Sequence, residues 1–320
     1  PTSDYPMGCF AYLAEAVKQK VGIPVMAVGR INNIKVAEDI LAKGQADLIA
    51  IGRQLIADPF WVDKTKEGRI EDINPCLSCN SCLEAVVTGE SQLRCAVNAA
   101  AGREEEYRIV ATTTPRKVLV VGGGVAGMEA ARVAALRGHK VMLCGRDEKL
   151  GGQLHAASQA PYKEPIAELI KYLDRQVTKA GVEVKLNCKV TADLVTKEKP
   201  DVVILATGAS PFIPDIPGVA RADVVHAVDV LTGRKDVGDR TVIIGGEMVA
   251  CDVAEFLTAQ KKKVTMVRRG PEMLTNVVLP HFREPILDRL NGKGVIMLTG
   301  VKYEKITKAG LILSDSVGRR

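Results

Sequence analysis

Four cysteines within one short segment carry the clearest chemical signal in this chain. Cys76, Cys79, Cys82 and Cys95 follow the spacing C-x2-C-x2-C-x12-C, so three thiolates can cover one face of a metal centre while the fourth comes from the end of a loop. Four cysteine thiolates hold a [4Fe–4S] cluster, which passes single electrons. A zinc site uses the same ligands, but it commonly pairs two C-x2-C motifs, whereas here the fourth cysteine stands alone. The segment predicts an iron–sulfur centre, with zinc as the alternative.

The bulk composition narrows the class of protein. The 320 residues are 47% hydrophobic and only 4% aromatic, and the net charge of +6 is spread along the chain. Without an aromatic-rich basic stretch, nucleic-acid binding is disfavoured, and the positive charge suits cofactors that carry phosphates. There is no secretory segment and no apolar run of transmembrane length, which predicts a cytoplasmic protein without a membrane partner. The length predicts two or three domains, and the start at Pro1 without a methionine, together with the end just after a strand-like run, suggests a fragment of a longer polypeptide.

Residues 1–72 contain two β-then-α units whose strands both end in glycine and arginine. Apolar runs precede Gly29 and Arg30 in the first unit, and Gly52 and Arg53 in the second. Such units predict the last two βα units of a (β/α)8 barrel, where the loops after strands 7 and 8 often bind a phosphate. Glycine lets backbone N–H groups approach the anion, and arginine binds it in a fork. The alternative is that each arginine forms a surface ion pair.

After a connector over residues 73–114, the segment 115–232 carries a dinucleotide fingerprint. A buried-type strand runs into Gly122, Gly124 and Gly127 in the pattern G-x-G-x-x-G, and a helix and a second strand follow. The first glycine makes the tight turn, the second admits the pyrophosphate to the helix N-terminus, and the third allows close packing of helix on strand. One element is missing, because Gly145 stands where an acid for the ribose hydroxyls is expected. Asp147 or Glu148 is the candidate substitute.

The segment 233–320 repeats the strand, turn and helix pattern with two departures from the template. The turn begins at Gly245, but Glu247 replaces the middle glycine, which adds bulk and a like charge next to a pyrophosphate. The next strand ends at Arg268 and Arg269, which suit the 2′-phosphate of NADP rather than the ribose of NAD. The two features disagree, so the sequence leaves open an NADPH site or a vestigial one.

The fold class that follows is α/β: the C-terminal end of a (β/α)8 barrel, an iron–sulfur connector, and two Rossmann-like dinucleotide-binding domains. This order resembles the iron–sulfur flavoenzymes related to Old Yellow Enzyme, such as 2,4-dienoyl-CoA reductase, trimethylamine dehydrogenase and related NADH:flavin oxidoreductases. The resemblance covers essentially the whole chain and rests on the motifs VGRI, IGRQLIADP, VVGGGVAGMEAA, LGGQ and ATGASPFIPDIPG together with the cysteine cluster. The cysteine spacing looks like that of the trimethylamine dehydrogenase branch.

The resemblance implies a set of cofactors and the residues that bind them. It implies that the FMN phosphate is held by Gly29, Arg30, Gly52 and Arg53, and that one [4Fe–4S] cluster is held by Cys76, Cys79, Cys82 and Cys95. It implies an FAD site formed by Gly122, Gly124, Gly127, Gly151, Gly152 and Gln153, with Thr207 and Gly208 nearby. NAD(P)H would bind to the domain that contains Gly245, Arg268 and Arg269. The family's proton donors lie in earlier barrel strands, so no catalytic residue is assigned within this sequence and the catalytic acid is expected upstream of Pro1.

The expected function is an oxidoreductase in which electrons pass from NAD(P)H to FAD, to the cluster and to FMN, and reduce an activated alkene such as an enone or enoyl thioester. A hydride passes to a flavin as an electron pair, whereas the cluster takes one electron at a time, so the cluster connects two flavins. The alternatives are an amine dehydrogenase or demethylase that feeds an electron-carrier protein, and a non-catalytic electron-transfer subunit. A small molecule is the expected substrate; its identity, the direction of electron flow and a homo-oligomeric state stay open.

Overall fold

The structure, a computed structural model, describes residues 2–89 and 92–315. Pro1, upstream of which the catalytic acid is expected, lies outside the described residues, so that expectation stays a prediction. The chain divides into two compact units. One contains the residues up to Leu154 together with Glu164–Gly208, and the other contains His155–Lys163 and the residues from Ala209 onward. Each unit is described by itself below.

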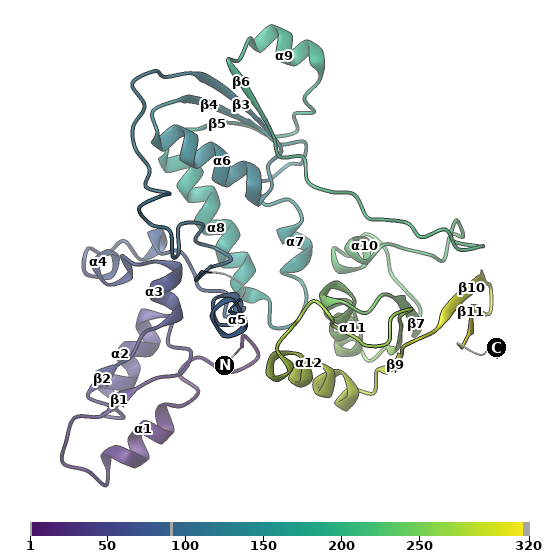
Figure 1. Cartoon of the computed structure of the whole chain (residues 1–320), viewed down its shortest axis with the longest axis horizontal. Helices are drawn as coiled ribbons and strands as arrows, with labels where there is room; N and C mark the ends of the chain where they lie inside the picture. Colours follow the sequence, from purple (N-terminus) through teal and green to yellow (C-terminus); the bar gives the residue numbers. More distant parts are fainter. Residues whose placement is uncertain (1, 90–91, 316–320) are drawn as a thin grey trace. The chain divides into compact units, whose positions relative to one another are not determined.

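The N-terminal segment of the first unit forms the two expected βα units. Helix α1 (Ala11–Lys18), strand β1 (Met26–Ala27), helix α2 (Ile34–Ala42) and strand β2 (Leu48–Ile49) follow in order, and β1 pairs with β2 in parallel. Asn33 caps α2, because its side chain accepts a hydrogen bond from the Lys35 N–H at 2.9 Å. Buried alanines and isoleucines of this segment share one small core. Figure 1 shows the four elements together in the purple part of the ribbon. The carboxyl ends of both strands therefore meet at one edge.

Short helices connect this segment to the cysteines. Helices α3 (Arg53–Ala57) and α4 (Trp61–Lys66) and a 3₁₀ turn η1 (Ile70–Asp72) are followed by the cysteine loop and helix α5 (Ser81–Thr88). Ser78 and Asn80 have left-handed backbone angles, with φ of 53° and 63°, and both are buried. This conformation curls the loop tightly at the start of α5.

A four-stranded parallel sheet forms the rest of the first unit. Its strands are β3 (Lys117–Val121), β4 (Lys140–Cys144), β5 (Glu183–Lys185) and β6 (Val202–Leu205). The helices of this part of the chain are α6 (Val125–Leu136), α7 (Leu154–Ala157), α8 (Glu164–Lys179) and α9 (Ala192–Glu198), and α7 continues from Leu154 into the second unit. The strand order is β5-β4-β3-β6, so the chain leaves β3 toward β4 on one side and returns as β6 on the other. Ligands of such sheets bind outside the carboxyl ends at this reversal point.

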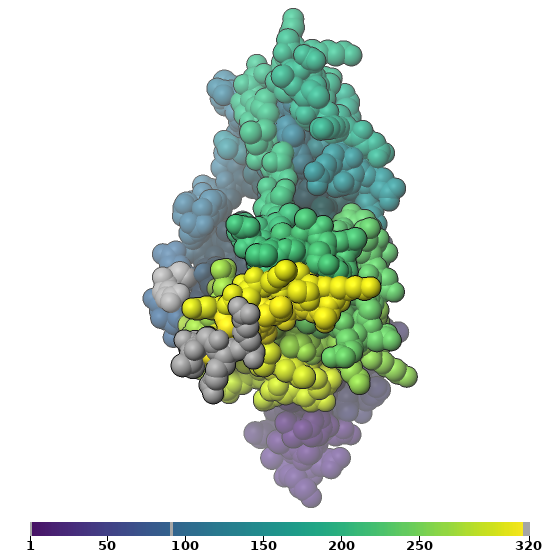
Figure 2. All heavy atoms as spheres, turned by 90° about the vertical axis from the view of Figure 1, so that its right-hand side faces the viewer, coloured from purple at the N-terminus to yellow at the C-terminus, as the bar shows by residue number. Residues whose placement is uncertain are grey.

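The second unit contains a smaller parallel sheet and a hairpin. Strands β7 (Arg240–Ile244), β8 (Lys263–Val267) and β9 (Ile296–Leu298) pair in that order, with α10 (Ala227–Leu231), α11 (Met248–Ala259) and α12 (Pro280–Gly292) as its helices. Strands β10 (Lys302–Thr307) and β11 (Gly310–Ser314) form an antiparallel hairpin, yellow on the face seen in Figure 2. A core of leucine, valine, methionine and alanine side chains packs α11 and α12 on the sheet.

The expected α/β class with parallel sheets is confirmed. The four predicted segments 1–72, 73–114, 115–232 and 233–320 remain our proposal for the domain organisation. In the part of the chain that the structure describes, every helix is too short or too polar to cross a membrane.

Candidate cofactor and cluster sites

The glycine turn after β3 has the geometry that a dinucleotide needs. A Cβ atom at Gly122 would lie 2.1 Å from the carbonyl oxygen of Ala206, and one at Gly127 would lie 1.8 Å from the carbonyl oxygen of Gly122. A Cβ atom at Gly124, by contrast, would meet no atom within 4 Å. Two glycines are thus required by close backbone packing, and the third leaves open space at the N-terminus of α6. No side chain caps that helix end, so its N–H groups face this space.

The remaining residues expected at the first nucleotide site gather around the same turn. Gly151 forms a bridge with Gly124 and donates its N–H to the carbonyl oxygen of Gly123 at 2.8 Å. Gly152 has a left-handed φ of 52°, and a Cβ atom there would lie 3.0 Å from the Cα of Gly124. Gly208 follows β6 with a φ of 73° and with open space on its side-chain face. The residues fit FAD, since the open face of Gly124 is the room that a pyrophosphate requires.

Gln153 and Thr207 flank this turn in sequence. Gln153 directly precedes α7, and the N–H of Thr207 would be 3.2 Å from a Cβ atom at Gly122. Thr207 therefore lies beside the glycine turn.

The end of β4 lacks a carboxylate, as the sequence indicates. Gly145 lies there and donates its N–H to the carbonyl oxygen of Lys185 at 2.8 Å. Asp147 forms an exposed ion pair with Arg146 at 3.7 Å, and its carbonyl oxygen accepts the N–H of Asn187. Glu148 is exposed in the bend that follows, and the assignment of either acid to the ribose hydroxyls stays a prediction.

Two arginines mark the strand ends of the N-terminal segment. Gly29 and Arg30 follow β1, with φ of 127° and 50°, and a Cβ atom at Gly29 would clash with the ring of Phe10. Gly52 precedes α3, whose first residue is Arg53. Burial lowers the pKa of Arg30, and the nearby Arg53 cation acts in the same direction as a smaller cause. The Arg30 Nε is buried and has no hydrogen-bond partner in the described structure. Two neighbouring guanidinium groups, one of them with an unused Nε donor, fit a phosphate group such as that of FMN.

The four cysteines of the connector form one electrostatic cluster of free thiols. Burial raises the pKa of Cys76 and Cys82, and both thiols are within range of the Cys79 and Cys95 thiols, which raise it further. Arg53 acts in the opposite direction on both. In residues 2–89 and 92–315 no group of three or more histidine, cysteine or acidic side chains has the spacing to hold a single metal ion. The donor set itself, four thiols without another ligand type, fits an iron–sulfur cluster or zinc.

A hydrogen bond connects the arginine site to the cysteine loop. The Arg53 Nη1 donates to the Oδ1 of Asn80, the buried left-handed residue between Cys79 and Cys82. Asn80 was not identified from the sequence. The one sequence feature that points to its role is that asparagine tolerates left-handed backbone angles better than most residues. Arg30 and Cys76 also line one cavity of about 560 Å³, so the strand end and the cysteine loop border the same space.

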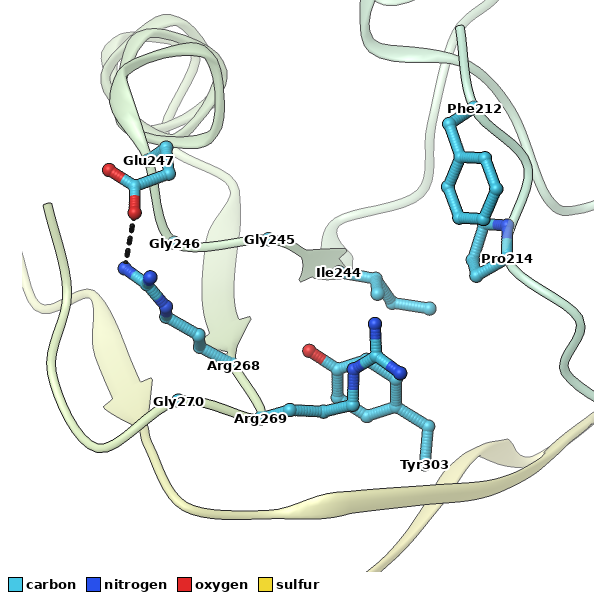
Figure 3. Close-up of a pocket in the computed structure, with 10 residues that line it drawn as sticks. All are labelled: Phe212, Pro214, Ile244, Gly245, Gly246, Glu247, Arg268, Arg269, Gly270 and Tyr303. Atoms are coloured by element: carbon cyan, nitrogen blue, oxygen red, sulfur yellow. Dashed lines mark ion pairs between the residues drawn. The ribbon is translucent and has the colours of Figure 1, made fainter. Parts of the chain in front are cut away.

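The second glycine turn has a different arrangement, shown in Figure 3. Gly245 follows β7 with a φ of 150°, and Glu247 lies at the N-terminus of α11 without capping it. The Glu247 carboxylate instead forms an ion pair with Arg268 at 2.6 Å and accepts hydrogen bonds from the Thr275 hydroxyl at 2.7 Å and the Asn276 N–H at 3.1 Å. Burial acts to raise the pKa of Glu247, but these donors outweigh it and lower the pKa. The Glu247 side chain thus adds the expected bulk at this turn, whereas its negative charge is already paired with Arg268.

Arg269 points into a cavity of about 450 Å³ at this turn. Its guanidinium lies 5.6 Å from the centre of the Tyr303 ring, and Phe212 and Pro214 border the cavity from the segment after β6 (Figure 3). Sequence reasoning missed Tyr303 and Phe212. Phe212 is 85% exposed. The sequence feature that could have identified it is an aromatic residue within a proline-rich stretch.

Comparison with known proteins agrees with the two parts of the fold. Residues 116–318 match the family described as pyridine nucleotide-disulphide oxidoreductase, and residues 9–72 match the NADH:flavin oxidoreductase / NADH oxidase family. An NADH oxidase of Thermoanaerobacter brockii is 40% identical over 327 residues, which is 99% of this chain and 50% of that protein.

Two solved structures share the fold over nearly the whole chain. A 2-naphthoyl-CoA reductase in complex with 2-naphthoyl-CoA has a TM-score of 0.93 and 33% identity, and the match covers 99% of this chain and 48% of that one. A 6-hydroxypseudooxynicotine amine oxidase from Pseudomonas geniculata N1 has a TM-score of 0.89 and 28% identity, with coverage of 100% and 50%. The chain thus spans about half the length of the proteins it matches.

Proposed function

This chain belongs to the pyridine nucleotide-disulphide oxidoreductase family, and from that premise we propose that it is the electron-transferring part of a flavin oxidoreductase that reduces an activated alkene. The predicted resemblance to flavoenzymes related to Old Yellow Enzyme is confirmed by the second family match and by the reductase among the solved structures. In the proposal, electrons pass from NAD(P)H to FAD, to a [4Fe–4S] cluster and to FMN, and a small molecule such as an enone or enoyl thioester accepts them. The protein is proposed to be cytoplasmic, and its catalytic acid is proposed to lie upstream of Pro1.

One observation carries this proposal: the bond from Arg53 to Asn80, which ties the strand-end arginines to the cysteine loop. A phosphate bound at Arg30 and Arg53 would lie beside the loop that holds the cluster, and short distances favour electron transfer. When bound, the flavins supply the exchange between electron pairs and single electrons, and the cluster supplies single-electron transfer.

The residues of this chain would perform binding and positioning. Gly124 and the α6 N-terminus would hold the FAD pyrophosphate, with Gly122 and Gly127 fixing the turn. Arg30 and Arg53 would hold the FMN phosphate, and Cys76, Cys79, Cys82 and Cys95 the cluster. Gly151, Gly152, Gln153, Thr207 and Gly208 would line the FAD site, with Gly29 and Gly52 at the FMN site.

A cysteine substitution tests the cluster. In protein purified anaerobically we expect about four iron and four sulfide per chain, and Cys79→Ser should lose most of both, because an alkoxide replaces a thiolate poorly. Cys188→Ser, which removes a partly buried thiol away from this loop, is the matched control and should keep them. Stoichiometric zinc without sulfide in the unmodified protein would contradict the proposal.

A second candidate is an amine dehydrogenase or demethylase that passes electrons outward to a carrier protein. The likeness to the amine oxidase structure favours it. Anaerobic addition of NADPH separates the two: bleaching of the flavin bands by NADPH supports the reductase, and bleaching by an amine with no response to either nicotinamide nucleotide supports the dehydrogenase.

A further inference from the structure

The cavity at the second glycine turn continues into a neighbouring one. Phe212, Pro214, Arg269 and Tyr303 line both, and the second cavity, of about 370 Å³, adds Lys302 at the start of β10. Both cavities lie at the carboxyl end of β8, the strand whose end recognises the adenosine ribose in a βαβ nucleotide fold. A hairpin outside the βαβ unit thus contributes a cation to the edge where the ribose is expected.

Of the two arginines at this strand end, Arg268 is already engaged. Glu247 holds it at 2.6 Å, and its Nη2 donates to the Thr275 hydroxyl at 2.8 Å. Its stem packs over the turn, because a Cβ atom at Gly246 would lie 2.6 Å from the Arg268 Cδ. The Nη1 of Arg268 has no hydrogen-bond partner in the described structure, but it lies in this ion pair, so a phosphate would have to compete with the Glu247 carboxylate for it.

Arg269 and Lys302 differ from Arg268 in their charge partners. Within the described ranges 2–89 and 92–315, neither has a carboxylate at ion-pair distance, and both border the second cavity beside Tyr303. The Tyr303 hydroxyl donates to the Val267 carbonyl oxygen at 3.0 Å, which holds the ring beside Arg269. Asp215 lines the same cavity and is the one acid there.

We propose that Arg269 and Lys302 form the subsite for the adenosine 2′-phosphate of NADPH, that Tyr303 and Phe212 flank the adenine, and that Glu247 withdraws Arg268 from this role. Two unpaired cations next to aromatic rings match a phosphate attached to a nucleoside, since guanidinium and ammonium groups bind phosphate and adenine stacks on aromatic rings. The inference rests on the proposed function, because it names the nucleotide that the second fold takes.

Two nucleotide fragments isolate the subsite, since 2′,5′-ADP and 5′-AMP differ only in the 2′-phosphate. Calorimetric titration of the flavin-loaded protein should show tighter binding of 2′,5′-ADP. Lys302→Ala and Arg269→Ala should each raise the Kd of 2′,5′-ADP by about tenfold and leave that of 5′-AMP within about twofold, because each removes one charge-assisted hydrogen bond.

Matched variants serve as controls. Lys305→Ala removes the same charge from the same strand outside both cavities, and Arg268→Ala removes the engaged arginine; both should leave the preference for 2′,5′-ADP intact. Asp215→Asn removes the opposing carboxylate and should tighten 2′,5′-ADP binding.

The outcomes separate the inference from the proposed function. Equal binding of the two fragments, an effect of Lys305→Ala as large as that of Lys302→Ala, or loss of the preference in Arg268→Ala would overturn the inference. If NADH binds and bleaches the flavin as well as NADPH does, the inference fails while the proposed function stands. If neither nicotinamide nucleotide binds, the nicotinamide step of the proposed function fails, and this inference fails with it.

Discussion

Gly124 and Gly127 are three residues apart in the first glycine turn, yet they meet different constraints. A side chain at Gly127 would overlap the Gly122 carbonyl oxygen, whereas one at Gly124 would enter open space. We therefore expect Gly127→Ala to destabilise the fold by about 2 kcal/mol or more, since the backbone must move. Gly124→Ala should change the unfolding free energy by less than about 1 kcal/mol and lose FAD. Denaturant unfolding and flavin content measure the two effects, and loss of stability in Gly124→Ala without loss of FAD would contradict this assignment.

Residue types indicated candidate sites, but not which of their side chains pair with one another. Glu247 and Arg268 were both identified from the sequence as departures from the template. Their ion pair depends on the parallel register of β7 and β8, which brings the residue after one glycine turn beside the end of the next strand. The hydrogen bond from Arg53 to Asn80 was likewise not predictable from the sequence. It requires a left-handed backbone conformation at Asn80, which most residues disfavour and which no periodic sequence pattern indicates.

At the scale of elements, Asp72 connects η1 to α8 within the first unit. Its carboxylate accepts from the Lys179 Nζ at 2.6 Å and the Gln176 Nε2 at 3.2 Å, and the hydrogen bond from Lys179 is the main cause that lowers the pKa of Asp72 below its ordinary 3.8. A lowered pKa in the folded state means that the contact stabilises the fold above pH 3.8 and that this contribution is lost as the pH falls through the folded-state pKa.

We accordingly expect Asp72→Asn to lower the unfolding free energy at pH 7 by about 1–2 kcal/mol, a modest value because Lys179 is half exposed. The difference from the unmodified protein should shrink as the pH falls below 3.8. Urea unfolding at several pH values measures it. Glu67→Gln, which breaks an exposed ion pair with Arg69, should have little effect at any pH. A difference that is constant with pH would show that the loss comes from packing.

The elements themselves followed from local sequence more closely than the sites did. Apolar runs before the two glycine turns and before Arg268 predicted strands, and β3, β7 and β8 are strands there. The strand order β5-β4-β3-β6 was not predicted from the sequence. It depends on the face of the sheet over which each connection between parallel strands crosses.

At the scale of the whole molecule, a single substitution at one of the two proposed flavin sites should remove one flavin and leave the other bound. Arg30→Ala should lose FMN and keep FAD, because the proposed phosphate ligands lie on the N-terminal βα units and the FAD turn lies after β3. Arg30→Lys keeps the charge and should retain part of the FMN. Chromatography of the released flavins gives the ratio directly. Loss of FAD with FMN retained would show that the two assignments are reversed.

The Arg53–Asn80 bond has a consequence for how the protein acquires its cofactors. One side chain serves both the proposed phosphate site and the loop of the cluster ligands, so a group bound at either place reduces the conformational freedom of the other. Thermodynamic linkage is reciprocal: whatever factor the cluster adds to FMN affinity, FMN adds to retention of the cluster. Under the proposed assignments, oxidative loss of iron should therefore weaken flavin binding at a site that contains no iron ligand.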